Sequence, residues 1–316
     1  MKILVAGEAI IDFLPTKQDG ELAFIPKPGG SPLNVAVGLS RLGVPTGFLG
    51  KISKDPFGQL LYAHLVQNQI DTKFVIEDPR PSALAFVFVE PGGEPQFYFY
   101  GLETADMFLT PADLPHPFPT EVDAIHFGSL AIVRDPIATA LLHLVKQVHS
   151  SCVVSFDPNI RPSQIPDRPR YLQRWGEWLQ FVDILKLSQS DIAYLRSDEN
   201  SVEELVHQWL KMGPSLVVVT QGAQGALAFT SSEIIHVKPP KVRVVDTVGA
   251  GDAFTAGFLA KLFHLGCLKK EFLRKIELNN LRQALEFATK VAAFTCTRKG
   301  ADPPWLAELE NTQYST

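Results

Sequence analysis

The chain has 316 residues, and its 46% hydrophobic and 20% charged content is ordinary for a globular protein, which excludes disordered and fibrous classes. Its formal net charge of −5 leaves no excess of basic side chains to attract nucleic acid or an anionic membrane. We therefore expect neither nucleic-acid nor membrane partners.

Two features of the sequence indicate a cytoplasmic protein. An apolar run follows Lys2, but Glu8 and Asp12 interrupt it too early for a signal peptide, and no later run reaches membrane-spanning length. The three cysteines stand far apart in apolar runs. Such spacing is typical of reduced core thiols and forms neither a metal site nor a disulfide framework.

The chain begins with an alternation of strands and helices. Asp12 follows an apolar strand, at the position where open α/β sheets bind ligands. A helix then begins in the favoured way, with Ser31 as N-cap, Pro32 at the first helical position and Gly43 just past the end. The predicted elements here are strands at 3–7 and 46–50 and a helix at 55–67.

Residues 13–30 and 73–100 interrupt this alternation. Extended runs are predicted at 22–25, 73–76, 83–89 and 96–100. A parallel crossover needs a dozen or more residues, so three strands without a helix between them are not expected as parallel neighbours in the main sheet. We predict that residues 13–30 and 73–100 form a small β-lid.

After Thr110 the alternation returns. Strands are predicted at 124–127, 153–156, 184–187 and 216–220, helices at 136–149, 169–181 and 278–297, and further strands up to Val245. There is no internal repeat and no low-complexity linker. We therefore predict one α/β domain over residues 1–316, with the β-lid inserted in it.

The segment from Val242 to Gly266 contains the most unusual turn. Its pattern predicts a strand, a tight turn at 246–252 and a buried helix at 253–265. A helix start carries unpaired N–H groups and partial positive charge, so a phosphate fits there. Asp252 beside such an anion makes sense if a carboxylate takes a proton from an attacking hydroxyl. The alternative is a glycine-rich turn in which Asp252 only complements the helix dipole.

Two common phosphate-binding motifs do not explain this turn. Phe254 stands where a dinucleotide-binding fingerprint needs its third glycine, and the chain contains no G-x-x-x-x-G-K-[ST] motif. Polar residues also interrupt the pattern at other strand ends and helix starts, at Asp12, Gly29, Gly30, Asn34, 157–161, Thr220 and Gly222. Several such interruptions at one edge of a sheet predict a ligand site.

Three motifs occur in a fixed order along the chain. They are Gly29-Gly30-x-x-x-Asn34-x-Ala36, then Asp157-Pro158-Asn159-x-Arg161, then Asp246-Thr247-x-Gly249-Ala250-Gly251-Asp252. With them the sequence resembles the PfkB carbohydrate kinases of the ribokinase-like superfamily, most closely their fructokinase branch, over nearly its whole length. The resemblance implies ATP-dependent phosphorylation of a sugar on a ribokinase-like α/β fold, whose Rossmann-like central sheet is flanked by helices and carries a small β-lid.

The resemblance also assigns catalytic roles. Asp252 is the general base that takes the proton of the sugar's hydroxymethyl group. The backbone N–H groups of Gly249, Ala250 and Gly251 form an anion hole, in which one preorganised donor contributes on the order of 3 kcal/mol. Arg161 reaches the reacting phosphates or the sugar, because its planar fork suits oxyanions.

The sugar ligands that the resemblance implies are Asp12, Gly29, Gly30, Asn34, Asn159 and Tyr100. Purely structural alternatives are a turn carboxylate at Asp12, a polar first-turn residue at Asn34, and an Asx turn with a surface arginine at 159–161. For the aromatic residues at 97–100, lid packing or a dimer contact is the more usual role.

For the nucleotide the resemblance implies Lys186, Ser188, Thr220, Gly222 and Gly225. Ser188 and Asp191 fit a helix capping box equally well, and they stand where many family members have an Asn-x-x-Glu segment that orders magnesium through water. Mg²⁺ is still expected, held mainly by the phosphates of ATP and by water. A monovalent cation such as K⁺ is implied near Asp246, Thr247 and Gly300.

The choice of sugar depends on charge. An acidic sugar or phosphosugar needs a cationic partner, and this chain has Gly101 where many relatives have an arginine after the lid strand. A neutral hexose is therefore favoured. Because Asp157-Pro158-Asn159 and Thr104-Ala105-Asp106 resemble fructokinases best, we predict phosphorylation of the 6-hydroxyl of D-fructose. Arg80 and Lys73 support 2-keto-3-deoxygluconate, or the sugar of another PfkB kinase, as the alternative. A remoter one is a non-catalytic sugar-binding protein. An exposed apolar lid would favour a homodimer.

Overall fold

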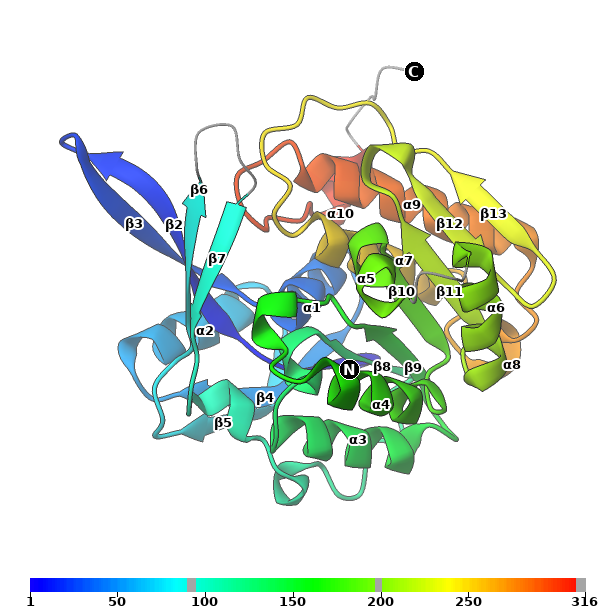
Figure 1. Ribbon diagram of the computed structural model, residues 1–316, viewed down its shortest axis with the longest axis horizontal. Coiled ribbons are helices and arrows are strands. Elements are labelled where there is room, and N and C mark those ends of the chain that lie inside the picture. The colour runs from blue at the N-terminus through cyan, green and yellow to red at the C-terminus, as the bar shows by residue number, and fades with distance from the viewer. Residues whose placement is uncertain (90–94, 197–200, 311–316) are drawn as a thin grey trace.

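The computed structural model describes residues 1–89, 95–196 and 201–310, and its main element is a nine-stranded sheet in the order β13-β12-β11-β10-β9-β8-β1-β4-β5 (Figure 1). The strands are β1 (Ile3–Ala6), β4 (Thr46–Ser53), β5 (Asp71–Asp78), β8 (Ala124–Gly128), β9 (Val153–Asp157), β10 (Ile184–Ser188), β11 (Leu216–Thr220), β12 (Ala226–Phe229) and β13 (Ile234–Val237). From β5 to β11 in this order all neighbours are parallel, and β12 and β13 are antiparallel additions. The carboxyl ends of the parallel strands therefore share one edge of the sheet.

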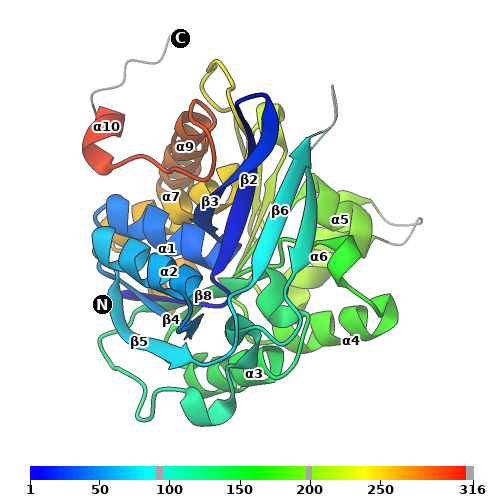
Figure 2. The ribbon, with the colours of Figure 1, turned by 90° about the vertical axis from the view of Figure 1, so that its left-hand side faces the viewer.

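Helices cover both faces of this sheet (Figure 2). One face carries α1 (Ser31–Arg41), α2 (Pro56–Gln67), α7 (Ala250–His264) and α9 (Leu278–Thr295), and the other carries α3 (Ile137–Val148), α4 (Arg168–Leu179), α5 (Gln189–Leu195) and α6 (Val202–Met212). Short helices α8 (Lys270–Leu273) and α10 (Leu306–Glu310) complete the set. A separate apolar core fills the space on each side of the sheet. The predicted α/β class is confirmed.

Helix α7 is buried on almost every side because α1 and α9 both pack against it. Ten of its fifteen residues are buried, including all from Asp252 to Ala260. The helix begins at Ala250, earlier than the expected 253. Asp252 is therefore held in the first turn of a rigid, fully packed helix.

A second sheet, in the order β3-β2-β6-β7, forms the lid. Its strands are β2 (Ile10–Gln18), β3 (Glu21–Gly29), β6 (Leu84–Val89) and β7 (Pro95–Tyr100), which lie together beside the main sheet (Figure 1). The register pairs Asp12 with Ala85 and Ala85 with Phe99, so these side chains share one face. The other face carries Phe13, Phe24, Phe86, Phe88, Tyr98 and Tyr100, whose rings contact one another, and we call it the aromatic lid face.

One predicted lid strand lies elsewhere. Strand β5, which contains the expected run at 73–76, pairs in parallel with β4 at the edge of the main sheet. The prediction was wrong because helix α2, just before β5, supplies the crossover that a parallel pair requires. The lid is thus built from residues 10–29, 84–89 and 95–100, and the predicted turn at 91–94 lies outside the described residues.

The strand predicted at 242–245 is also wrong. These residues form an irregular segment after β13, and the N–H of Val245 donates to the carbonyl of Cys296. Pro239 and Pro240 follow β13 and have no N–H for a sheet ladder.

Within the described ranges no helix is long and apolar enough to cross a membrane. Cys152, Cys267 and Cys296 are all unpaired.

Candidate active site

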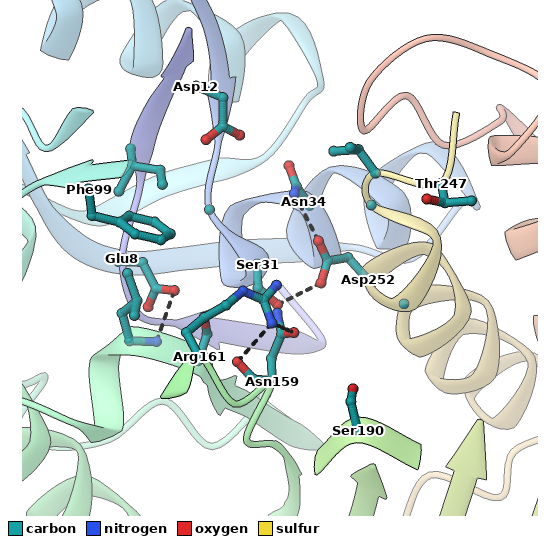
Figure 3. A pocket seen from close by; sticks show the side chains of 17 residues that line it. Glu8, Asp12, Ser31, Asn34, Phe99, Asn159, Arg161, Ser190, Thr247 and Asp252 are labelled. Carbon is teal, nitrogen blue, oxygen red and sulfur yellow. Dashed lines mark hydrogen bonds between the residues drawn. The ribbon is translucent and has the colours of Figure 1, made fainter. Parts of the chain in front are cut away.

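Two adjoining cavities lie at the carboxyl edge of the main sheet. The first, of about 500 Å³, lies between the lid and the core (Figure 3). It is lined by nine of the predicted site residues, namely Asp12, Gly30, Asn34, Asn159, Arg161, Thr247, Gly249, Gly251 and Asp252. The second, of about 510 Å³, is mainly apolar and includes the predicted Thr220, Gly222 and Gly225. Thr247 and Gly251 line both cavities, so the 246–252 turn forms the wall between them.

Asp252 points into the first cavity from the start of α7 (Figure 3). The hydroxyl of Ser31 donates to its Oδ1 at 2.6 Å, and the amide of Asn34 donates to its Oδ2 at 2.9 Å. Burial raises the pKa of Asp252, while the bonds from Ser31 and Asn34 oppose that rise by stabilising the ionised form. A carboxylate has further acceptor sites, so Asp252 remains able to accept a hydroxyl proton.

The partners of Asp252 correct two expectations. Ser31 is not the N-cap of α1; Gly30 occupies that position, and the Ser31 side chain turns to Asp252 instead. Asn34 lines the cavity as predicted, but its amide nitrogen is already used by Asp252. Sequence reasoning missed the contribution of Ser31, because a serine before a proline fits a helix cap as well as a ligand of a distant carboxylate.

Gly249 allows the turn to approach the C-terminal segment of the chain. It has a left-handed φ of 74°, and a Cβ there would lie 2.5 Å from the Cβ of Ala301. The N–H of Ala250 donates to the carbonyl of Thr247 at 3.2 Å. The expected three-donor anion hole is therefore reduced, since the Ala250 N–H is occupied within the turn.

Asp12 lies across the first cavity, on the inner face of the lid (Figure 3). Burial and the negative charge of Asp252 raise its pKa to about 7, and Arg161 acts in the opposite direction. Gly29 does not line the cavity, but a Cβ at that position would lie 2.0 Å from Asp12 Oδ2. Gly29 thus provides the space for the Asp12 carboxylate, whereas Gly30, with φ of 102°, lines the cavity directly.

Phe99, not Tyr100, faces the first cavity (Figure 3). Tyr100 is 64% exposed on the aromatic lid face, where its ring packs edge to face against Phe86. Neighbouring residues of a strand point to opposite faces, so a site on the Asp12 face takes Phe99 and leaves Tyr100 outside. The structure therefore places Tyr100, predicted as a sugar ligand, outside the cavity, and places the adjacent Phe99 in its lining.

The segment after β9 brings Asn159 and Arg161 to the cavity. Asn159 has a φ of 39°, and its N–H donates to Asp157 Oδ1 at 3.1 Å, as in an Asx turn. Arg161 donates to Asn159 Oδ1 at 2.7 Å while lining the cavity. The Asx turn of the purely structural alternative is therefore present. However, this turn directs Arg161 into the cavity and not onto the surface.

Two predicted nucleotide residues have other partners. Ser188 and Asp191 form a capping box at α5, and Asp191 also accepts from the N–H of Ile160 at 2.7 Å, which leaves neither side chain free in this arrangement. Lys186 donates to Asp157 at 2.7 Å and is only 6% exposed. Ser190, which sequence reasoning did not single out, lines the first cavity instead.

The residues predicted for a monovalent cation lie together. Asp246 accepts from the N–H of Val248 at 3.0 Å and from the N–H of Gly300 at 2.8 Å, and thereby ties the turn to the C-terminal segment. Both of its carboxylate oxygens are occupied. Across the described residues, no three His, Cys, Asp or Glu side chains gather into a metal site.

Comparison with known proteins identifies the family of the chain that carries this site. Residues 1–308 match the family described as pfkB family carbohydrate kinase. The chain belongs to this family. As a PfkB carbohydrate kinase it is a sugar phosphotransferase, and its structure has the ribokinase-like fold of that family.

Fructokinases are prominent among its relatives. A fructokinase of Rhizobium leguminosarum bv. trifolii is 38% identical over 89% of this chain and 85% of its own length. A solved fructokinase of Xylella fastidiosa with bound ATP superposes with a TM-score of 0.89 at 29% identity, covering 98% of this chain and 97% of that one. A double mutant of a fructokinase of Vibrio cholerae O395, bound to fructose, ADP and potassium ion, superposes with a TM-score of 0.86 at 29% identity and the same coverage.

Proposed function

We propose that this PfkB kinase transfers the γ-phosphoryl group of ATP to the 6-hydroxyl of D-fructose. The observation that carries the proposal is the position of Asp252, a buried carboxylate at a helix N-terminus on the wall between two cavities. A sugar in the first cavity and a nucleotide in the second would meet at this turn. Fructokinases of bacteria and plants are among the relatives of the chain, which supports the choice of reaction.

In this mechanism Asp252 takes the proton of the attacking hydroxyl, and Ser31 and Asn34 hold its carboxylate in place. The backbone N–H groups of Gly249 and Gly251 stabilise charge on the transferred phosphoryl group, since the first N–H groups of a helix have no carbonyl of their own helix to bond. Arg161 lies on the same cavity and contributes positive charge. Phosphoryl transfer depends mainly on such positioning and charge stabilisation.

The charges around the first cavity favour a neutral sugar. Arg80 pairs with Asp78 and its guanidinium lies 3.8 Å from the centre of the Phe108 ring, and Lys73 belongs to β5 of the main sheet. The two cationic residues that suggested an acidic sugar are therefore engaged elsewhere. Phe99 offers an apolar surface to the carbon face of a sugar, and Asp12 offers acceptors to its hydroxyls.

The residues present fit Mg²⁺ and a monovalent cation in different ways. With no cluster of acidic ligands among the described residues, Mg²⁺ would be held by the phosphates of ATP and by water, where it neutralises phosphate charge. The carboxylate oxygens of Asp246 already accept N–H groups. A cation such as K⁺ would take backbone carbonyls near Thr247 and Gly300 together with a remaining acceptor site of the Asp246 carboxylate.

An acceptor panel tests the proposed reaction. Release of ADP is followed by a coupled assay with fructose, ribose, glucose, 2-keto-3-deoxygluconate and fructose 6-phosphate in separate reactions. Fructose is expected to be the best acceptor, and the product should carry phosphate at the 6-position. Absence of turnover with fructose would refute the assignment, and preferential turnover of the acidic sugar would support the alternative instead.

We also propose that two copies of the chain associate through the aromatic lid face. Tyr98 is 50% and Tyr100 64% exposed on this face, and Leu22, 61% exposed, extends the apolar surface along β3. The strands β3 and β7 are the edges of the lid sheet, and exposed apolar edge strands favour pairing with another chain. Because the sugar cavity lies on the opposite face of the lid, such a dimer would leave the cavity open.

A further inference from the structure

A buried ion pair lies beneath the turn that separates the two cavities. Lys186, on β10, donates to Asp157 Oδ2 on β9 at 2.7 Å, and the two side chains are only 7% and 1% exposed. A Cβ added to Gly251 would lie 3.2 Å from the ammonium nitrogen. The ammonium group therefore occupies the space under Gly251 that a side chain would otherwise fill.

Thr255 joins this pair to the turn. Its hydroxyl, one helical turn after Gly251, lies 3.3 Å from Asp157 Oδ2 and 3.1 Å from the carbonyl of Gly251. Burial alone would lower the pKa of Lys186, but the nearby carboxylates of Asp157 and Asp191 outweigh that effect and raise it. The neighbouring carboxylates thus favour the protonated, positively charged form of Lys186.

A buried ion pair gives a fold little net stability. Two charges removed from water lose hydration that their attraction repays only in part, and apolar residues of similar volume often serve a fold equally well. Asp157 is the last residue of β9, at the edge on which the cavities open, and Lys186 reaches it from the middle of β10. Lys270 and Asp183 form a comparable pair at the opposite end of β10, with side chains 18% and 7% exposed.

We propose that Lys186, held by Asp157, is a positioning residue of the kinase: its ammonium group supports the Gly251 turn from below and supplies the positive field that keeps Asp252 ionised and favours an anion on the turn. This role rests on the proposed function, in which Asp252 is the base. It differs from the expected role of Lys186 as a nucleotide ligand, because the ammonium is directed to Asp157 and to the underside of the turn.

The charges around Asp252 fix the sign of the effect. Asp12 faces it from β2, Asp157 and Arg161 from β9 and the segment that follows, and Lys186 from β10, while α1 contributes only the neutral Ser31 and Asn34. Burial is the main cause of the raised pKa of Asp252, and among the charged groups Asp157 raises this pKa further while Lys186 lowers it. Removing the ammonium should therefore move the acid limb of the pH profile to higher pH, and neutralising Asp157 should move it to lower pH.

The test compares Lys186→Met, Asp157→Asn and the double variant with Lys270→Met as the matched control. Each intact protein is assayed for kcat, for the KM of sugar and ATP, and for the pH dependence of kcat at saturating sugar, to which the titration of Asp12 in the free enzyme does not contribute. For Lys186→Met we expect kcat to fall about a hundredfold, both KM values to stay within about threefold of wild type, and the acid limb to move to higher pH. Lys270→Met should leave all of these unchanged.

The double variant separates a functional role from a structural one. It removes both buried charges together and is therefore expected to fold even if Lys186→Met alone does not. If the ammonium acts on the turn, kcat stays low in the double variant while the acid limb returns toward its wild-type position. Recovery of wild-type kcat, or an acid limb that moves the same way in both single variants, would overturn the proposal.

Failure of the proposed function is recognised separately. It appears as absence of fructose turnover by the wild-type protein, before any variant is compared. The variants are then assayed with whichever sugar of the panel the wild type phosphorylates, so the role of Lys186 is decided in either case.

Discussion

Asp252 accepts hydrogen bonds from two neutral donors, Ser31 and Asn34, which orient its carboxylate. We predict that Asp252→Asn lowers kcat by about a hundredfold to ten-thousandfold, because an amide cannot take the hydroxyl proton. Affinities for sugar and ATP, measured by calorimetry, should stay close to those of the wild type. Near-normal turnover would exclude Asp252 as the base and would support the alternative in which Asp252 only complements the helix dipole.

Asp12 provides a pH-dependent test of the sugar cavity. Its pKa of about 7 without ligand reflects burial and the charge of Asp252. Sugar hydroxyls donate to the ionised form, so binding should strengthen as pH rises and should lower this pKa. We predict that the Kd for fructose falls about tenfold from pH 6 to pH 8, with proton release seen by calorimetry in buffers of different ionisation enthalpy. Asp12→Asn should bind weakly and without this pH dependence, and an unchanged pH dependence in that variant would exclude Asp12 as the source.

At the scale of one residue, the sequence identified most of the site but not its contacts. Asp12, Asn34, Arg161 and Asp252 were recognisable because polar residues interrupt apolar patterns. Whether Lys186 meets a nucleotide or a neighbouring carboxylate depends on the rotamer of a long side chain and on the packing of two strands. Neither the side-chain rotamer nor the packing of the two strands can be predicted from the spacing of residues in the sequence.

The lid strands carry a prediction at the scale of the element. Phe99 and Tyr100 are adjacent on β7, yet they belong to opposite faces of the lid. We predict that Phe99→Ala raises the KM for fructose about tenfold, since loss of an aromatic contact of roughly 1.4 kcal/mol corresponds to that factor. Tyr100→Ala, truncated equally, should leave KM unchanged, and the reverse result would refute the strand register.

Helix α2 carries a prediction about stability. Asp55 caps its N-terminus through Gly58 and also accepts hydrogen bonds from the N–H and the hydroxyl of Ser82, just before β6 of the lid. We predict that Asp55→Ala lowers the free energy of unfolding by about 1–2 kcal/mol, measured by urea denaturation at pH 7.

The pH dependence of this cap has a definite sign. Burial opposes ionisation, but the bonds from Ser82 and Gly58 outweigh it and lower the pKa of Asp55. The contribution of Asp55 is therefore complete above the pKa it has in the unfolded chain, and it is lost as pH falls through the lower value of the folded state. The stability difference between the wild type and Asp55→Ala should narrow on acidification, and a difference that widens instead would contradict the cap.

Helices that begin with capping residues could be predicted from the sequence. Strands that depend on which other strand they pair with could not. Asp55-Pro56 located the start of α2 because a capping aspartate and a proline have local causes. Strand β5 was misassigned because its sheet depends on whether the preceding helix serves as a crossover. The run at 242–245 has β-branched residues but no strand beside it, so its local preference is not realised.

For the whole molecule, the sequence predicted the α/β class but not the order of the strands. The sheet places β1 between β4 and β8, and this brings Asp12 from the start of the chain to face Asp252 near its end. Local patterns contain no record of such long-range neighbours. The resemblance to PfkB kinases does contain this information. It predicts that residues far apart in the sequence, such as Asp12 and Asp252, line one cavity.

The aromatic lid face predicts the oligomeric state. We expect sedimentation equilibrium to give the mass of a dimer at micromolar concentration, because burying the exposed apolar surface of the aromatic lid face stabilises the association. A charge placed in such an apolar interface is costly. Tyr98→Lys should shift this mass toward that of the 34.8 kDa monomer. Ile234→Lys, at a residue 52% exposed on β13, tests whether any exposed apolar residue has this effect and should leave the dimer intact. A wild type that is monomeric under these conditions would refute the dimer, and equal dissociation by both variants would refute the aromatic lid face as its interface.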